Sequence, residues 1–289
     1  MSSPAGVIHD IGYQRYAGPR LGERDVFLAL YTQSLRTVFG FGRSFKAKIF
    51  PWLIVGVVGL VAVVVIAFRA QADQVLMTYA QFPQNLSTLM VLFVAIAAPE
   101  LVSRDLHSGV LPLYFSRPLR PADYALAKLA ALVSAIVLVW GGAQLAIFAG
   151  AAFSVKGFGN VMNELGDMGL GVIYSALYAV VFAGIALLVA AFLKRRAVAA
   201  AAIVGTFLVT TPITAVLVIL PSQTANQLAQ IVNPATLVGG VGDWLFEPAG
   251  SDGPLGIGPF GPLYALVTVL LVALCVVLLL ARYRKVSQS

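Results

Sequence analysis

The chain has 289 residues, of which 60% are hydrophobic and 11% charged, and its mean hydropathy is +0.91. These values exclude an ordinary water-soluble globular domain. The formal net charge of +7 could suit a nucleic-acid partner, but the cations are sorted by position along the chain, as described next, so we expect no nucleic-acid binding. The single cysteine, Cys275, excludes an internal disulfide and a thiolate metal cluster.

Six apolar segments divide the chain, and most reach the roughly 20 residues that a helix needs to cross ~30 Å of hydrocarbon. We therefore expect an all-α membrane protein with a cytoplasmic N-terminal segment (1–49), a six-helix transmembrane domain (50–281) and a cytoplasmic tail (282–289). The expected spans are about 50–68, 85–102, 126–153, 168–193, 197–220 and 262–281.

The cations alternate between the loops that join these spans. Seventeen of the 19 Lys and Arg residues fall on one side, and only Arg69 and Lys156 fall on the other. The first side carries a net charge of +11 and the second −4. The positive-inside rule then places both termini in the cytoplasm, so we expect a multi-pass protein of a bacterial inner (plasma) membrane.

The second span is the weakest, because its continuous apolar run, 89–98, is too short to cross a bilayer alone. A short run of this kind could instead be re-entrant. Re-entry would put the basic loop 104–128 outside and break the charge rule. We therefore expect this segment to span.

The span cores lack Asp, Glu, Lys, Arg and His, apart from Glu100 near the predicted inner boundary. Ion-coupled transporters need such groups at membrane depth, and a membrane enzyme needs a nucleophile and a base. The chain also has no phosphate-binding Gly-rich loop. We expect no enzyme activity, no catalytic or metal site and no cofactor on this chain.

Two N-terminal segments have distinct patterns. Segment 22–48 predicts an amphipathic helix, or two helices joined near Gly40 and Gly42, with its apolar face and cations suited to a lipid surface. Ahead of it lies a short polar stretch that could dock on a neighbouring soluble surface, with these candidate residues: His9, Asp10, Tyr13, Arg15 and Tyr16.

The loop 99–128 changes from polar to apolar after Ser108 and closes at Arg117-Pro118, before Pro121 opens the next helix. Its apolar part is too short to span, and its side chains suit a partner protein better than water. The candidate contact residues are Arg104, Asp105, Ser108, Gly109, Leu111, Leu113, Tyr114 and Phe115.

The outer loop 221–261 contains no Lys or Arg. We expect a helical turn or two over 224–232, an interfacial or re-entrant helix over 235–246, and loop beyond. Trp244 and Phe246 are candidates for an outer gate, and a passive cap is the alternative. Candidate pathway residues within the spans are polar: Gln144, Tyr174, Tyr178, Thr206 and Thr210.

The stretch Ser103-Arg104-Asp105, Ser108 to Leu113, Arg117-Pro118, Asp123-Tyr124 and Lys128 resembles the first cytoplasmic loop of type-2 ABC (ATP-binding-cassette) transporter permeases. The N-terminal sequence from His9 to Tyr16 is similar to the start of bacterial permeases of this family. Many members carry Thr where this chain has Val110.

The resemblance implies a permease, usually a homodimer, that pairs with two cytoplasmic ATPase subunits carrying ATP and Mg²⁺. It makes 104–115 the coupling helix, 22–48 the connecting helix and the outer helices a cap. It also implies export (efflux) of a hydrophobic or amphipathic small molecule, drug-like or lipid-like. A membrane scaffold or accessory subunit without transport is the alternative. A lipid-modifying enzyme is disfavoured for want of catalytic groups.

Overall fold

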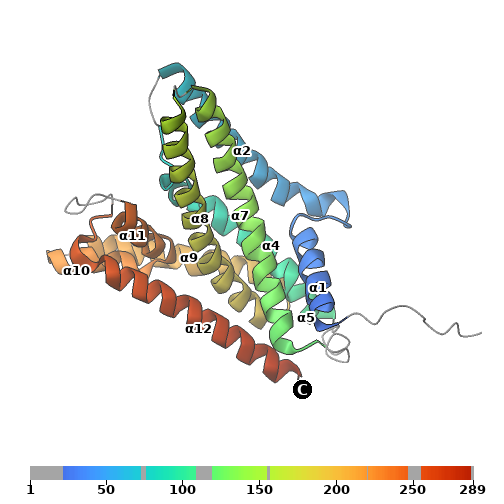
Figure 1. Cartoon of the computed structure of the whole chain (residues 1–289). Helices are drawn as coiled ribbons and strands as arrows, with labels where there is room; N and C mark the ends of the chain where they lie inside the picture. The colour runs from blue at the N-terminus through green and yellow to red at the C-terminus, as the bar shows by residue number, and fades with distance from the viewer. Residues whose placement is uncertain are drawn as a thin grey trace, which may run out of the picture.

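The computed structural model describes residues 22–72, 76–108, 119–154, 157–219, 221–246 and 255–287. Within these ranges the chain is helical and contains no β-strand, which confirms the all-α class (Figure 1). The helices are α1 Glu23–Val38, α2 Phe45–Ala72, α3 Gln81–Asn85, α4 Ser87–Leu101, α5 Ser103–Ser108, α7 Pro121–Ser154, α8 Phe158–Phe192, α9 Arg196–Val218, α10 Gln223–Ala229, α11 Pro234–Phe246 and α12 Gly261–Ser287, with 3-10 turns η1 Gln230–Val232 and η2 Gly258–Phe260.

Five helices of the described chain are long and apolar enough to cross a membrane. The fold is therefore that of a multi-pass helical membrane protein. The five are Phe45–Gln71, Pro121–Phe153, Phe158–Phe192, Arg196–Val218 and Gly258–Lys285.

The expected second span, 85–102, does not qualify by length. Its helix, α4, has 15 residues and is flanked by turn residues, Leu86 before it and Val102 after it. At 1.5 Å per residue it is about 22 Å long, shorter than the ~30 Å hydrocarbon core. The structure thus supports five spans outright, and α4 is a short helix between α3 and α5.

The N-terminal segment forms two helices that separate at the predicted glycines. Gly40 and Gly42 have φ of 72° and 76°, a left-handed conformation that glycine adopts without steric cost. The second helix runs directly into the first span, since α2 begins at Phe45.

The apolar face of α1 packs mainly against protein, whereas the sequence suggested a lipid surface. Leu30 and Val38 are buried, and α1 contacts α7 and α4. The Tyr31 hydroxyl also donates to Ser134 Oγ at 2.9 Å. Phe41, which lies beyond the end of α1, is 47% exposed. Helix α1 is therefore attached to the bundle itself.

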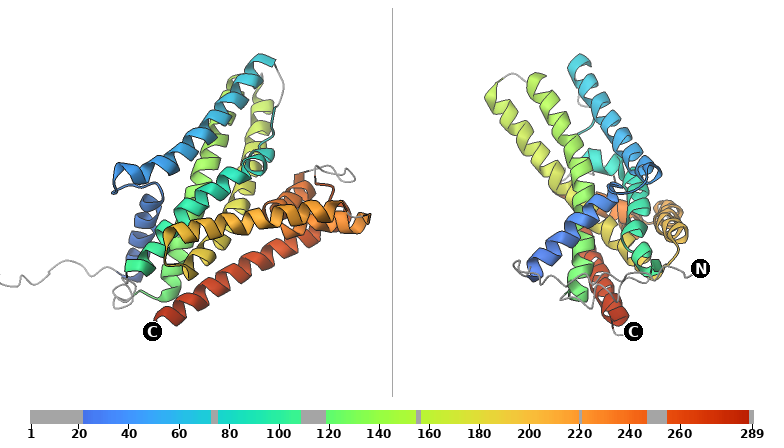
Figure 2. Two further views of the ribbon diagram at one scale, coloured as in Figure 1. Left: turned by 180° about the vertical axis from the view of Figure 1, so that it is seen from behind. Right: turned by 90° about the vertical axis from the view of Figure 1, so that its right-hand side faces the viewer.

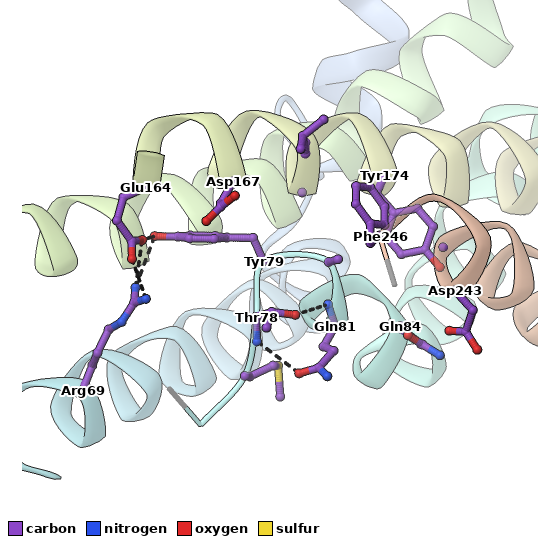
Figure 3. Close-up of a pocket in the computed structure, with 15 residues that line it drawn as sticks. Arg69, Thr78, Tyr79, Gln81, Gln84, Glu164, Asp167, Tyr174, Asp243 and Phe246 are labelled. Atoms are coloured by element: carbon purple, nitrogen blue, oxygen red, sulfur yellow. Dashed lines mark hydrogen bonds and ion pairs between the residues drawn. The ribbon is translucent and has the colours of Figure 1, made fainter. Parts of the chain in front are cut away.

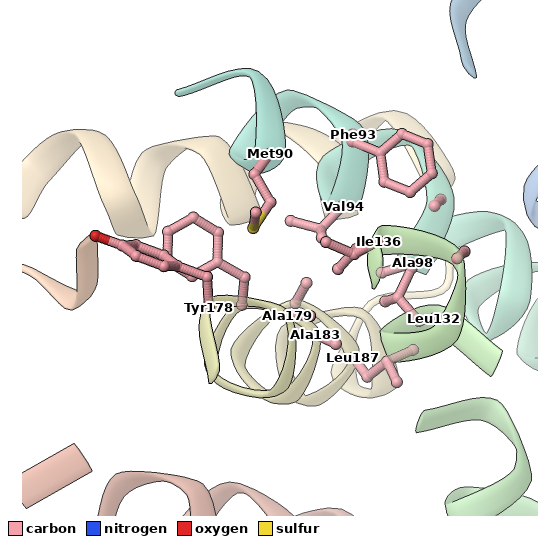
Figure 4. Close-up of a cluster of buried hydrophobic side chains, with 14 of the residues drawn as sticks. Met90, Phe93, Val94, Ala98, Leu132, Ile136, Tyr178, Ala179, Ala183 and Leu187 are labelled. Atoms are coloured by element: carbon pink, nitrogen blue, oxygen red, sulfur yellow. The ribbon is translucent and has the colours of Figure 1, made fainter. Parts of the chain in front are cut away.

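The hydrophobic core lies where α4, α7 and α8 meet (Figure 4). Met90 and Phe93 of α4 and Ile136 of α7 are at most 1% exposed there, as are Ala179 and Ala183 of α8. The alanines of α8 allow α4 to approach closely. Although α4 is short, it contacts α1, α2, α7, α8 and α9, so it is the central helix of the described bundle.

The other helices surround this core (Figures 1 and 2). Helix α2 rises beside α7 and α8, while α9 and α12 run obliquely across the bundle. Helices α10 and α11 lie between the end of α9 and the start of α12. They confirm the helices predicted over 224–232 and 235–246.

Candidate functional sites at the two ends of the bundle

The first polar cluster joins α5 to α7. Asp105 Oδ2 lies 3.0 Å from Lys128 Nζ and accepts a hydrogen bond of 2.7 Å from the Tyr124 hydroxyl. Lys128 is 7% exposed and Tyr124 is fully buried. The ring of Tyr283 at the end of α12 packs edge-on against Tyr124, with centroids 5.0 Å apart. Asp105 therefore connects the short helix α5 to the buried first turns of α7.

A second cluster is centred on Glu100, the penultimate residue of α4. Its two carboxylate oxygens bind Arg43 Nη1 at 2.6 Å and Arg196 Nη1 at 2.8 Å. Arg43 belongs to the turn between α1 and α2, and Arg196 is the first residue of α9. One carboxylate thus ties together the ends of three helical segments.

Two further contacts belong to the same end of the molecule. The buried Ser103 hydroxyl donates to the Ala190 carbonyl at 3.1 Å, and Arg282 Nε donates to the Ala191 carbonyl at 3.3 Å. These bonds attach α5 and α12 to the last turn of α8. We call this end, with the Asp105 and Glu100 clusters, the cation-rich end.

The coupling residues proposed from the sequence are placed only in part. Arg104 and Ser108 are exposed on α5, and the Ser108 hydroxyl donates to the Arg104 carbonyl within that helix. Asp105, expected as a contact to a partner protein or as a cap at the start of this helix, is turned inward to Lys128. The others lie outside the described residues: Gly109, Leu111, Leu113, Tyr114 and Phe115. So do His9, Asp10, Tyr13, Arg15 and Tyr16.

The opposite end of the bundle holds a different ion pair. Arg69 near the end of α2 binds Glu164 of α8 through two contacts, Nη2–Oε1 at 2.7 Å and Nη1–Oε2 at 3.1 Å. The Tyr79 hydroxyl donates to Glu164 Oε2 at 3.0 Å. Burial, and then the bond to Glu164, raises the pKa of Tyr79 to about 12, so this phenol stays protonated near neutral pH.

Beside this pair lies a cavity of about 450 Å³ between the segment before α4, helix α8 and helix α11 (Figure 3). Arg69 and Glu164 mark one end of the cavity, and Asp243 of α11 marks the other. The lining residues are Arg69, Met77, Thr78, Tyr79, Ala80, Gln81, Gln84, Glu164, Asp167, Leu170, Gly171, Tyr174, Gly242, Asp243 and Phe246.

Two candidate pathway residues, Tyr174 and Tyr178, hold α11 in place. The Tyr174 hydroxyl donates to the Val238 carbonyl at 2.9 Å, and the Tyr178 hydroxyl donates to the Ala235 carbonyl at 3.0 Å. A Cβ at Gly242 would collide with the Tyr174 phenol, so glycine is what permits this approach. Tyr174 also lines the cavity, whereas Tyr178 is fully buried.

The other three pathway candidates do not join the cavity. Gln144 is fully buried, and its Nε2 donates to the Tyr79 carbonyl at 3.1 Å and to Ser175 Oγ at 3.0 Å. Thr206 is exposed and Thr210 partly exposed on α9, and each bonds to a carbonyl of its own helix. The structure therefore brings Gln144 and the two tyrosines to neighbouring positions and leaves the threonines on another face.

The two residues suggested as an outer gate take different positions on α11. Phe246 lines the cavity, and its ring centroid lies 5.3 Å from that of Tyr174. Trp244 is 47% exposed and packs over Gly261, the first residue of α12. Of the two, Phe246 is the one that lines the cavity.

Several residues of these sites were not selected from the sequence. Lys128 was counted as a loop cation, yet it is buried in the second turn of α7. Glu164, Asp167 and Asp243 were counted only as charges of one side. The one available signal was Arg69, a lone cation next to a span on the acidic side, because such a charge calls for a carboxylate partner.

No protein-family model matches the chain, and comparison with curated proteins gives no significant match. The class that the fold supports is a multi-pass helical membrane protein, with five helices suited to span a bilayer. The resemblance to type-2 ABC permeases rests on the sequence of 103–128 and stays a prediction.

Proposed function

We propose that this chain is the transmembrane permease subunit of an ATP-binding-cassette exporter, with ATP hydrolysis on separate cytoplasmic subunits. The observation that carries the proposal is how segment 109–118 is attached. Its two flanking helices, α5 and α7, are joined by the Asp105–Lys128 ion pair and the Tyr124–Asp105 hydrogen bond. A partner that moved this segment would therefore move both helices together.

The attachment continues into the rest of the bundle. Ser103 fixes α5 to α8, and Glu100, just before α5, is bound by Arg43 and Arg196. Since packed helices shift as rigid elements, a displacement at the cation-rich end is transmitted to α4, α8 and α9. This is the mechanical property that a coupling segment requires.

In this proposal α4 crosses the membrane as the sixth span. Its first turn follows α3, which lies by the cavity, and its last turn carries Glu100 at the cation-rich end. A 15-residue helix crosses when protein surrounds it on most sides, and α4 is surrounded by five helices. With α4 crossing, the cation-rich end faces the cytoplasm, and both termini are cytoplasmic in a bacterial inner membrane.

The assembly would contain two ATPase subunits and a second permease copy, most simply as a homodimer. The substrate would be a hydrophobic or amphipathic small molecule moved outward. The pattern of ionisable groups supports ATP as the energy source, because those on the described spans lie near the helix ends, in ion pairs or at the surface, instead of at mid-membrane depth.

Reconstitution in vesicles tests the proposal. The permease is co-expressed with the ATP-binding subunit that co-purifies with it, and transport of a fluorescent amphiphile is followed. Transport should persist when proton and sodium gradients are collapsed, and it should stop when the ATPase is inactivated. Gradient-driven transport by the chain alone would refute the proposal. Failure to recruit any ATPase would leave the scaffold alternative.

A further inference from the structure

The cavity at the opposite end of the bundle carries an excess of negative charge. Among the lining residues that the structure describes, Arg69 is the one cation, and its guanidinium is matched by Glu164 at 2.7 and 3.1 Å. With Arg69, the carboxylates Glu164, Asp167 and Asp243 give these described residues a formal charge of −2, and Asp243 also accepts a hydrogen bond from the Leu255 amide. Asp243 is only 7% exposed, so its field is weakly screened by water.

The charges are separated along the cavity. In Figure 3 the Arg69–Glu164 pair lies at one end and Asp243 lies at the other, with Asp167 beside Tyr79 near the pair. Carboxylates therefore lie at both ends of the cavity, whereas the guanidinium of Arg69 lies at one end only. Apolar walls around such a site focus the negative potential into it.

The remaining walls suit an aromatic or aliphatic body. Tyr79, Tyr174 and Phe246 present rings, and Met77 and Leu170 add apolar surface. Aromatic faces attract organic cations, with larger effect where water is excluded. The volume of about 450 Å³ lies within the range of pockets that hold drug-sized molecules.

The carboxylates are not arranged to hold a metal ion. Within the described ranges, no three His, Cys, Asp or Glu side chains come close enough together to form a metal site. Spread carboxylates with intervening rings match an extended ligand better than a small, strongly hydrated ion.

We propose that this cavity is a binding site for a lipophilic organic cation, with its charge near Asp243 and its apolar body against Tyr174 and Phe246, while Asp167 adds to the negative potential from the other end. The inference deepens the proposed function, on which its transport role rests, by naming the substrate class. Under that function the site would hold the cation on the outer side of the membrane.

Binding to the purified chain, without any ATPase, tests the site directly. Equilibrium dialysis of the detergent-solubilised protein against tetraphenylphosphonium, corrected with protein-free micelles, gives the affinity. Tetraphenylborate, which has the same shape and the opposite charge, serves as the matched probe. We expect the cation to bind at least about tenfold more tightly than the anion.

Three variants locate the site. Asp243→Asn should weaken tetraphenylphosphonium binding about tenfold, and Asp167→Asn, which is more exposed, about threefold. Asp123→Asn, on α7 at the cation-rich end, should leave binding unchanged. Because Asp243 accepts a hydrogen bond of 2.8 Å from the Leu255 amide, its variant is compared at equal fraction folded. Asp167→Asn provides the same test without that contact.

Equal binding of the two probes, or affinities that neither Asp167→Asn nor Asp243→Asn changes, would overturn the proposal. Failure of the exporter proposal gives a different result. Cation binding would then be retained while no ATPase subunit associates or supports transport.

Discussion

Lys128 Nζ lies 3.0 Å from Asp105 Oδ2, and this pair joins the helix before the proposed coupling segment to the helix after it. Lys128 is nearly inaccessible to solvent, so its ammonium depends on Asp105 for compensation. The pair explains why an acidic residue at the start of the loop is turned inward. The pair holds α5 against α7.

The first prediction concerns this pair. Asp105→Asn should lower the free energy of unfolding by about 3–5 kcal/mol, because it leaves a buried ammonium without its counterion. Lys128→Met in the same chain should recover most of the loss, since both charges are then gone. Thermal unfolding followed by size-exclusion fluorescence measures the change. Arg120→Ala, at an exposed site, is the control; a loss no larger than in this control would contradict the prediction.

The second prediction concerns the ion pair at the opposite end. Glu164→Gln should destabilise the protein by about 1–3 kcal/mol, since the mostly buried Arg69 loses its charged partner. The exchange Arg69→Glu with Glu164→Arg should be less damaging than either single reversal. Arg24→Met, at an exposed position, is the matched control. If the exchange were as damaging as the two reversals added together, the pairing would be disproved.

The third prediction concerns the packing of α11. Gly242→Ala should destabilise the packing of α11 on α8 by about 1–3 kcal/mol, because the added methyl group collides with the Tyr174 phenol. Gly166→Ala on α8 meets no atom within 4 Å and should be neutral or slightly stabilising. Limited proteolysis between α10 and α12 reports the difference. Equal cleavage of the two variants would count against the observed packing.

The fourth prediction concerns topology and follows from the 17:2 division of the cations. In the Cys275→Ser background, a cysteine at Ser251 should react with an impermeant thiol reagent added outside intact cells. A cysteine at Ser116 should react only after permeabilisation. The reverse pattern would overturn the proposed orientation.

The sequence predicted the long helices and the outer helices well, because hydropathy and charge act locally along the chain. The break at Gly40 and Gly42 was also predictable from glycine chemistry. The length of α4 was harder to predict. The hydropathy of residues 85–86 and 102 does not indicate that the helix stops at Ser87 and Leu101. The short helix is stabilised by its neighbours, which only the tertiary structure specifies.

The site residues were harder to predict, because pairing brings together positions far apart in sequence. Arg69 and Glu164 are 95 residues apart, and Tyr31 and Ser134 are 103 apart. Thr206 and Thr210 were chosen for their hydroxyls, yet helix carbonyls satisfy those hydroxyls on α9. A polar residue in a span is thus a weak indicator of a pathway.

The central claim is that segment 109–118 couples this chain to an ATPase. The direct test uses a double variant that carries both Leu111→Ala and Leu113→Ala. It is compared with Arg120→Ala, and membrane insertion and oligomeric state are checked in both. Buried apolar anchors of an interface typically contribute about 2 kcal/mol or more each, and rim charges less.

The measurement is the amount of ATPase subunit that co-purifies and its stimulated hydrolysis rate. We expect the double variant to lose the subunit or its stimulation, and Arg120→Ala to retain both. A double variant that binds and stimulates its ATPase like the wild type would contradict it.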